Sequence, residues 1–88
     1  MSDFFLKDQV IVVTGAAGGI GRAICEDLSE AGAKIVLAGR NADTLKETAD
    51  SLKIADSLIV STDITKPESV KSLLDATLAK YNLIDAVS

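Results

Sequence analysis

An apolar stretch that runs directly into a glycine-rich turn constrains this chain more than any other feature. The stretch Val10–Val13 is rich in β-branched residues, which suits a strand buried on both faces. A turn from Gly15 to Gly21 follows, and a helix beginning Arg22-Ala23-Ile24 is expected after it. A helix start exposes unpaired backbone N–H groups beside the positive end of the helix dipole. Glycines let a phosphate approach such groups closely, so nucleotide binding is the first hypothesis.

Length and charge restrict the remaining possibilities. The 88 residues fit one small domain, residues 1–88, and are too few for two. An apolar content of 48% indicates a globular chain rather than a disordered one. The net charge of −4 argues against nucleic acid and against an anionic membrane surface as partners.

The content of cysteine and histidine bears on compartment and chemistry. The single cysteine, Cys25, excludes an internal disulfide and suits a cytoplasmic protein. With no histidine, a histidine metal site or general base is excluded, and no metal is expected. No apolar stretch approaches the roughly 20 residues of a membrane span, and the N-terminus lacks the pattern of a signal peptide.

Apolar segments alternate with helical patterns along the rest of the chain. Further strands are expected at Lys34–Ala38, Leu58–Val60 and Leu83–Val87. Three apolar stripes at helical spacing lie between the strands: Ile20, Ala23, Ile24, Leu28 and Ala31; Leu45, Ala49 and Leu52; and Val70, Leu73, Leu74, Thr77 and Leu78. Gly32 is expected to end the first helix, and Thr44 and Thr65 to open capping boxes at the other two.

The order of elements is therefore β-α-β-α-β-α-β. Such alternation predicts an α/β fold, a Rossmann-like parallel sheet with right-handed crossovers that forms an incomplete, half doubly wound domain. Ligands in these folds bind at the carboxyl ends of the strands. The glycine turn, Arg40 and Asp63 each follow a strand, so they are expected to lie along the same edge of the sheet.

The residues from Thr14 to Gly21 fit the pattern T-G-x-x-x-G-x-G. This pattern resembles the cofactor loop of the short-chain dehydrogenase/reductase family and differs in spacing from the G-x-G-x-x-G fingerprint of other dinucleotide-binding folds. Three further matches are Ala31-Gly32-Ala33 before the second strand, Arg40 after it, and Asp63-Ile64-Thr65 after the third. The resemblance extends from about Leu6 to Val87.

The resemblance implies a role for each matching residue. Gly15 would form the turn, and the backbone around Ala17, Gly18 and Ile20 would face the pyrophosphate and riboses of a dinucleotide. Gly19 and Gly21 would allow close approach and tight packing of helix on strand. Asp63 would accept a hydrogen bond from the adenine amino group, with the Ile64 N–H beside it.

The turn after the second strand indicates which dinucleotide is bound. Relatives that prefer NAD carry an acid at the end of this strand, where it binds the ribose 2′-hydroxyl. Here that position is Gly39, and Arg40 and Asn41 follow it in the turn and are assigned to the same cofactor site. Glycine removes the repulsion of a 2′-phosphate, and Arg40 supplies a planar, charge-assisted donor. NADP(H) is therefore expected rather than NAD(H).

The catalytic part of the family pattern cannot be placed on this sequence. The resemblance implies a later Asn-Asn-Ala-Gly stretch, a serine, and a tyrosine and lysine spaced Y-x-x-x-K. The chain ends at Ser88, about where the first of these should begin, and its one tyrosine, Tyr81, is followed four residues on by Asp85. We therefore expect the amino-terminal cofactor-binding part of an oxidoreductase for alcohols or carbonyls, with no catalytic residues and no turnover of its own.

Other interpretations stay open. In the family the strand order resembles 3-2-1-4-5, so the fourth strand here would be an open edge, through which a stand-alone nucleotide-binding module would form a homodimer or higher homo-oligomer. A structural module that binds nothing is a third possibility. A methyltransferase fits poorly, because methyltransferases with a similar glycine loop usually carry an acidic residue near the position that Gly39 occupies here. The glycine turn, Arg40 and Asp63 also have plain structural interpretations, as a tight connection, a solvated side chain and a helix cap.

Overall fold

The computed structural model describes residues 7–54 and 56–87, so residues 1–6, 55 and 88 of the expected domain lie outside the described part. Its seven elements alternate along the chain: β1 (Val10–Thr14), α1 (Gly19–Glu30), β2 (Lys34–Gly39), α2 (Ala42–Ser51), β3 (Ser57–Ser61), α3 (Pro67–Tyr81) and β4 (Ala86–Val87). All strands are parallel, in the order β3-β2-β1-β4. The Rossmann-like α/β architecture and the edge position of the fourth strand are confirmed.

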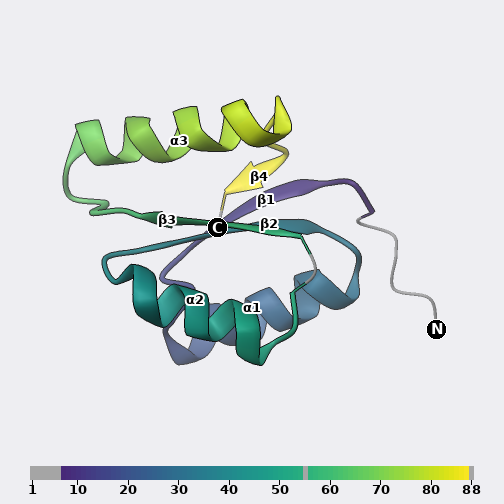
Figure 1. The fold of residues 1–88 in the computed structure, drawn as a ribbon. Coiled ribbons are helices and arrows are strands. Elements are labelled where there is room, and N and C mark those ends of the chain that lie inside the picture. The colour runs from purple at the N-terminus through teal and green to yellow at the C-terminus, as the bar shows by residue number, and fades with distance from the viewer. Residues whose placement is uncertain (1–6, 55, 88) are drawn as a thin grey trace.

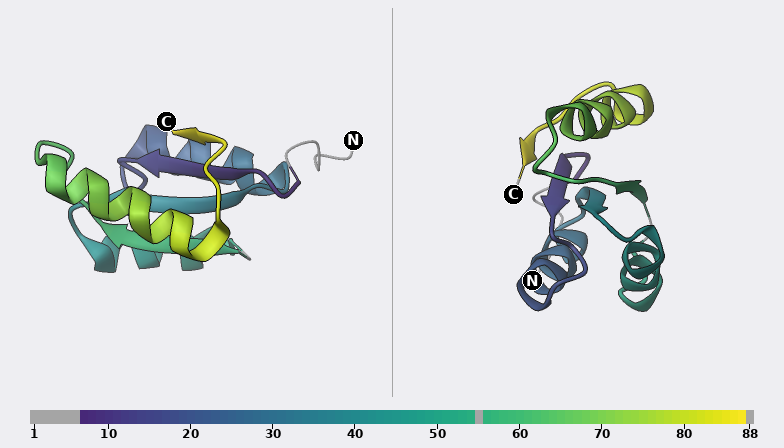
Figure 2. Two further views of the ribbon diagram at one scale, coloured as in Figure 1. Left: turned by 90° about the horizontal axis from the view of Figure 1, so that it is seen from above. Right: turned by 90° about the vertical axis from the view of Figure 1, so that its left-hand side faces the viewer.

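Helices cover the sheet on both faces, with α1 and α2 on one side and α3 on the other (Figures 1 and 2). Successive residues of β1 point to opposite faces, so Ile11 and Val13 pack in the core beneath α1 and α2. Val10 and Val12 pack in the second core together with Leu73 of α3. This two-sided burial explains why β1 is a continuous apolar run.

The glycine turn brings α1 very close to the end of β1. Gly15 has a φ of +66°, a conformation that favours glycine, and its N–H donates to the carbonyl oxygen of Ala38 on β2 at 3.0 Å. The Cα of Gly21 lies against the Gly15 carbonyl, so no side chain fits between them. The helix begins at Gly19, earlier than the expected start at Arg22, because the Gly18 carbonyl already accepts the first helical bond from Arg22 N–H at 2.7 Å. As a result Ile20 is 81% exposed and does not belong to the inward stripe.

The two expected capping boxes are wrong. Asn41 caps α2, because its Oδ1 accepts hydrogen bonds from the N–H groups of Asp43 at 2.9 Å and Thr44 at 3.2 Å. The helix therefore begins at Ala42, and Thr44 lies within its first turn. Lys66 occupies the N-cap position of α3, and the hydroxyl of Thr65 instead donates to Asp63.

Within the residues that the structure describes, the fourth strand is shorter than the expected Leu83–Val87 and pairs with β1 at Ala86 and Val87. Asp85 comes just before the strand and bonds Val10 twice. Its N–H donates to the Val10 carbonyl oxygen at 2.9 Å, and its carboxylate accepts from the Val10 N–H at 2.7 Å. A side-chain oxygen thus takes the place of a strand carbonyl, and regular pairing begins one residue later.

A polar cluster at the amino-terminal edge of the sheet holds the end of α3. The Tyr81 hydroxyl donates to a carboxylate oxygen of Asp56 at 2.7 Å, and Lys80 Nζ donates to the Ser57 carbonyl oxygen at 2.8 Å. The ammonium groups of Lys34 and Lys80 lie 5.8 Å and 5.2 Å from the centroid of the Tyr81 ring, within cation–π range. We call these five residues the amino-edge cluster.

The contact between Gly21 and the Gly15 carbonyl leads to a prediction with a matched control. Gly21→Ala places a Cβ inside the van der Waals radius of the Gly15 oxygen, so we expect a destabilisation of about 1–3 kcal/mol or more from overpacking. Gly19→Ala, two residues earlier in the same turn of helix, meets no described atom within 4 Å and should leave the free energy of unfolding unchanged or raise it slightly. Urea unfolding of both variants measures the difference, and equal stabilities would contradict the packing argument.

Candidate functional site

A pocket of about 290 Å³ opens at the carboxyl ends of β1, β2 and β3. Its lining comes from the three segments that follow these strands: Gly15, Gly39, Arg40, Thr62, Ile64 and Thr65. Gly15, Arg40 and Ile64 are among the predicted site residues, so segments far apart in the sequence do meet at this edge. Thr62 and Thr65 were not predicted, although their position directly after β3 is a signal that would have found them.

The start of α1 borders this edge of the sheet with free donors. Ala17, Gly18, Gly19 and Ile20 are all exposed, whereas Gly21 is buried. Because the first helical bond into Gly18 comes from Arg22, the N–H groups of the first turn lack acceptors within the helix. In the described part of the chain no side chain caps this end and no acid lies in its first turn.

This arrangement fits a diphosphate group. At Gly15 and at Gly19 the space that a Cβ would occupy holds no described atom within 4 Å, so a ligand can reach the backbone there. The helix dipole adds positive potential at the same point. Backbone donors, open space and a positive helix end are the chemistry that binds phosphate at helix N-termini.

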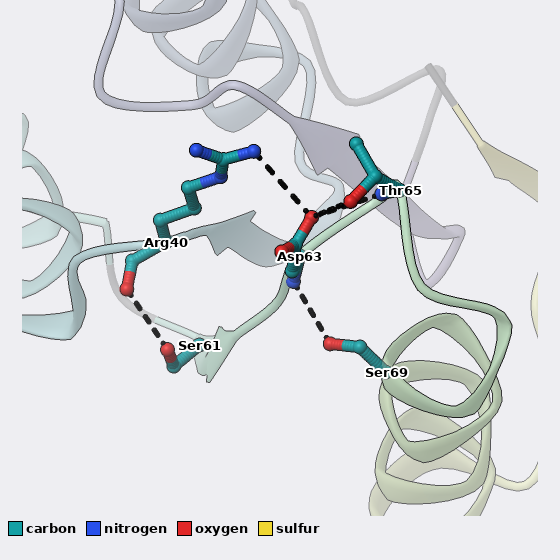
Figure 3. A network of polar contacts seen from close by, with 5 residues as sticks. All are labelled: Arg40, Ser61, Asp63, Thr65 and Ser69. Atoms are coloured by element: carbon teal, nitrogen blue, oxygen red, sulfur yellow. Dashed lines mark hydrogen bonds and ion pairs between the residues drawn. The ribbon is translucent and has the colours of Figure 1, made fainter.

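Arg40 and Asp63 approach each other from neighbouring strand ends (Figure 3). The Nη2 of Arg40 lies 3.5 Å from Oδ1 of Asp63. The same Oδ1 accepts hydrogen bonds from the N–H of Thr65 at 3.0 Å and from its hydroxyl at 2.6 Å. The N–H of Asp63 donates to Oγ of Ser69 in α3 at 2.8 Å, and the hydroxyl of Ser61 donates to the Arg40 carbonyl oxygen at 3.0 Å.

These contacts favour the ionised form of Asp63, which the ordinary pKa of a carboxyl already gives at neutral pH. The hydrogen bonds from the Thr65 hydroxyl and N–H, followed by the positive charge of Arg40, hold the pKa of the Asp63 carboxyl below its ordinary value of 3.8. At neutral pH the site therefore contains a carboxylate and a guanidinium side by side.

Asn41 and Thr62 have structural roles at the ends of β2 and β3. The Asn41 side-chain oxygen is occupied by the cap of α2, so its observed contacts are structural. Thr62 is 2% exposed, and its N–H donates to the Gly39 carbonyl oxygen at 2.6 Å, which fixes the spacing between the ends of β2 and β3.

Two other reactive side chains lie away from the pocket. Tyr81 belongs to the amino-edge cluster at the opposite ends of the strands, where burial, followed by the hydrogen bond to Asp56, raises the pKa of its hydroxyl. Cys25 is buried on the inner face of α1, and burial raises the pKa of its thiol from the ordinary value. Neither group faces the ligand edge of the sheet.

The chain matches a known protein family. Residues 9–88 match the family described as short chain dehydrogenase, and the chain belongs to that family. Members of the family bind a nicotinamide dinucleotide. None of the helices within residues 7–54 and 56–87 has the length and apolar character needed to cross a membrane.

Individual relatives are similar over almost the whole chain. An uncharacterized oxidoreductase of Staphylococcus aureus (strain MRSA252) is 45% identical over 82 residues, which cover 93% of this chain and 36% of that protein. A metagenomic short-chain oxidoreductase solved in complex with NADP has 30% identity and a TM-score of 0.86, covering 93% of this chain and 38% of the other. The 3-ketoacyl-(acyl-carrier-protein) reductase of Brucella melitensis, solved with NADH, has 28% identity and a TM-score of 0.86, covering 93% and 34%. The chain thus spans about a third of the length of the relatives it matches.

Proposed function

We propose that this chain is the NADP(H)-binding part of a short-chain dehydrogenase/reductase that interconverts an alcohol and a carbonyl compound. The observation that carries the proposal is the convergence of Gly15 in the glycine turn, Arg40 and Ile64 around one pocket at the carboxyl ends of the strands. The family match supports dinucleotide binding. The structural neighbours include one solved with NADP and one solved with NADH, so the choice of NADP(H) rests on Gly39 and Arg40.

The glycine turn would hold the diphosphate of the cofactor. Gly19 and Ile20 lie in the exposed first turn of α1, where helical N–H groups lack intrahelical acceptors, and Ala17 offers exposed backbone beside them. The N–H of Gly18 already donates to the Gly15 carbonyl oxygen at 3.0 Å, so Gly18 would contribute close approach rather than a donor. Asp63 would accept a hydrogen bond from the adenine amino group, and the N–H of Ile64 lies next to it in the chain.

The segment after β2 would select NADP(H) over NAD(H). Arg40 has a side chain that is 74% exposed, so its guanidinium is accessible to a 2′-phosphate. Gly39 does not owe its identity to crowding, because a Cβ there would make ordinary contacts of 3.4–3.8 Å with the Leu45 side chain. The fold therefore tolerates a side chain at this position, and glycine is explained better by the absence of a charge that would repel phosphate.

A bound nicotinamide would supply the hydride chemistry, and the residues described here would bind and orient it. Proton transfer to a substrate needs a donor at the ligand edge, and Tyr81 lies at the other edge. We therefore assign no catalytic residue to this chain. We propose that the chemistry is performed by residues that correspond to the two thirds of the relatives which this chain does not match.

Two further proposals concern the cellular compartment and the self-association of the protein. A single cysteine, buried and free, suits a reducing compartment, so we place the protein in the cytoplasm. The β4 edge carries an exposed Val87, 59% accessible, which favours association of two copies through this strand. A self-associating nucleotide-binding module without enzymatic activity is accordingly the second candidate function.

The first prediction from the proposed function concerns Arg40. Arg40→Ala should weaken NADPH binding by about 1–3 kcal/mol, because a charge-assisted bond to the 2′-phosphate is lost, and should change NADH binding far less. Gly39→Asp should produce the opposite preference, favouring NADH. Nicotinamide fluorescence and calorimetry give the dissociation constants.

Lys71→Ala is the control, since it removes a positive charge from an exposed pair on α3 rather than from the pocket. Equal losses for NADPH and NADH in the Arg40 variant would remove Arg40 from the phosphate role. No binding of either cofactor at millimolar concentration would favour a purely structural module.

A second prediction concerns catalysis. The 88-residue chain with saturating NADPH should not reduce any carbonyl substrate, because the pocket lining among the described residues has no tyrosine, cysteine, lysine or carboxylic acid to act as general acid, and Tyr81 lies at the other edge. Absorbance at the reduced nicotinamide band follows the reaction with a panel of aldehydes and ketones. Turnover above the buffer rate that persists after repeated purification would overturn this proposal.

A third prediction concerns self-association. At tens of micromolar the chain should sediment as a dimer, because pairing of two β4 edges hides exposed apolar side chains. Val87→Lys places a charge on that edge and should shift the chain toward the monomer, whereas Ile64→Lys, at the opposite, pocket side of the sheet, should not. A monomer at all concentrations would contradict the proposed edge pairing.

A further inference from the structure

The contact between Arg40 and Asp63 suggests a second influence on cofactor choice. The two residues follow neighbouring strands, and their side chains close on each other beside the pocket, with Nη2 and Oδ1 3.5 Å apart (Figure 3). The guanidinium that is proposed to meet a 2′-phosphate is thus already next to an anion. Any phosphate that binds Arg40 must do so in the presence of this carboxylate.

Asp63 is the fixed member of the pair. Thr65 holds its Oδ1 through two hydrogen bonds, and Ser69 holds its backbone N–H. The Asp63 side chain is 30% exposed, whereas that of Arg40 is 74% exposed, and Ser61 holds Arg40 through its backbone carbonyl oxygen. When a ligand arrives, Arg40 can move and Asp63 stays.

We propose that Asp63 sets the degree of cofactor selectivity, because its carboxylate competes with a 2′-phosphate for the guanidinium of Arg40. This inference rests on the proposed function, in which Arg40 binds that phosphate. A ribose 2′-hydroxyl is neutral, so it neither draws Arg40 away nor meets repulsion from Asp63. A 2′-phosphate loses binding energy in both ways, and Asp63 therefore narrows the preference for NADP(H) that Arg40 creates.

The test uses two small probes that differ only in the 2′-phosphate: 2′,5′-ADP and 5′-AMP. Asp63→Asn removes the charge and keeps an oxygen that can accept from Thr65. We expect the ratio of the two dissociation constants, measured by calorimetry, to shift about two- to fivefold toward 2′,5′-ADP, the range for loss of an exposed ion pair. An unchanged ratio, or a shift toward 5′-AMP, would overturn the proposal.

The Arg40→Ala background separates competition from simple repulsion. Competition requires Arg40, so Asp63→Asn should change the ratio much less when Arg40 is absent. An equally large change in that background would overturn the proposal in favour of repulsion alone. If Arg40→Ala by itself leaves the ratio of the wild-type chain unchanged, the proposed NADP(H) preference fails first, and the two failures are distinguishable.

Two controls protect the experiment. Asp75→Asn makes the same chemical change in the exposed Lys71–Asp75 pair on α3 and should leave the ratio unaltered, which excludes an effect of net charge. Should Asp63→Asn unfold the chain, Asp63→Ser keeps a hydroxyl oxygen in the turn before α3 and is expected to shift the ratio in the same direction. Absence of the shift in a folded Asp63→Ser variant counts against the proposal equally.

Discussion

The close contact of Gly21 with the Gly15 carbonyl is the constraint on which the rest of this structure depends. It sets the distance between α1 and the end of β1, and so places the free N–H groups of the first helical turn at the ligand edge of the sheet. A side chain at position 21 would push the helix away and carry those donors with it. The geometry that we propose for phosphate binding therefore depends on packing as well as on electrostatics.

Much of this arrangement follows from patterns that the sequence displays directly. Continuous apolar runs predicted buried parallel strands, and alternation with helical stripes predicted the layers and the shared edge. The predictions failed where a side chain replaces a backbone group. Asn41 rather than Thr44 caps α2, and the Asp85 carboxylate substitutes for a strand carbonyl opposite Val10. Such exchanges depend on local geometry that composition and periodicity do not encode.

The candidate site likewise has features that could be predicted from the sequence and features that could not. That Gly15, Arg40 and Ile64 would converge could be predicted, because each follows a parallel strand and the strand ends meet. Thr62 and Thr65 could have been found in the same way, from their position directly after β3. The anchoring of Asp63 by Thr65 and Ser69 could not, since it depends on the local geometry of the β3–α3 connection. Arg40 and Asp63, to which separate roles were assigned from the sequence, thus belong to one polar network (Figure 3).

The amino-edge cluster has a consequence for how such a chain can change over evolution. Tyr81, Asp56 and the two lysines fasten α3 at the end of the sheet remote from the ligand, and they share no residue with the pocket. Substitutions around the pocket therefore leave this fastening intact. Residues on the pocket side such as Arg40 can therefore vary while α3 stays attached to the sheet, whereas Gly15 and Gly21 on the same side remain constrained by backbone conformation and by packing, respectively.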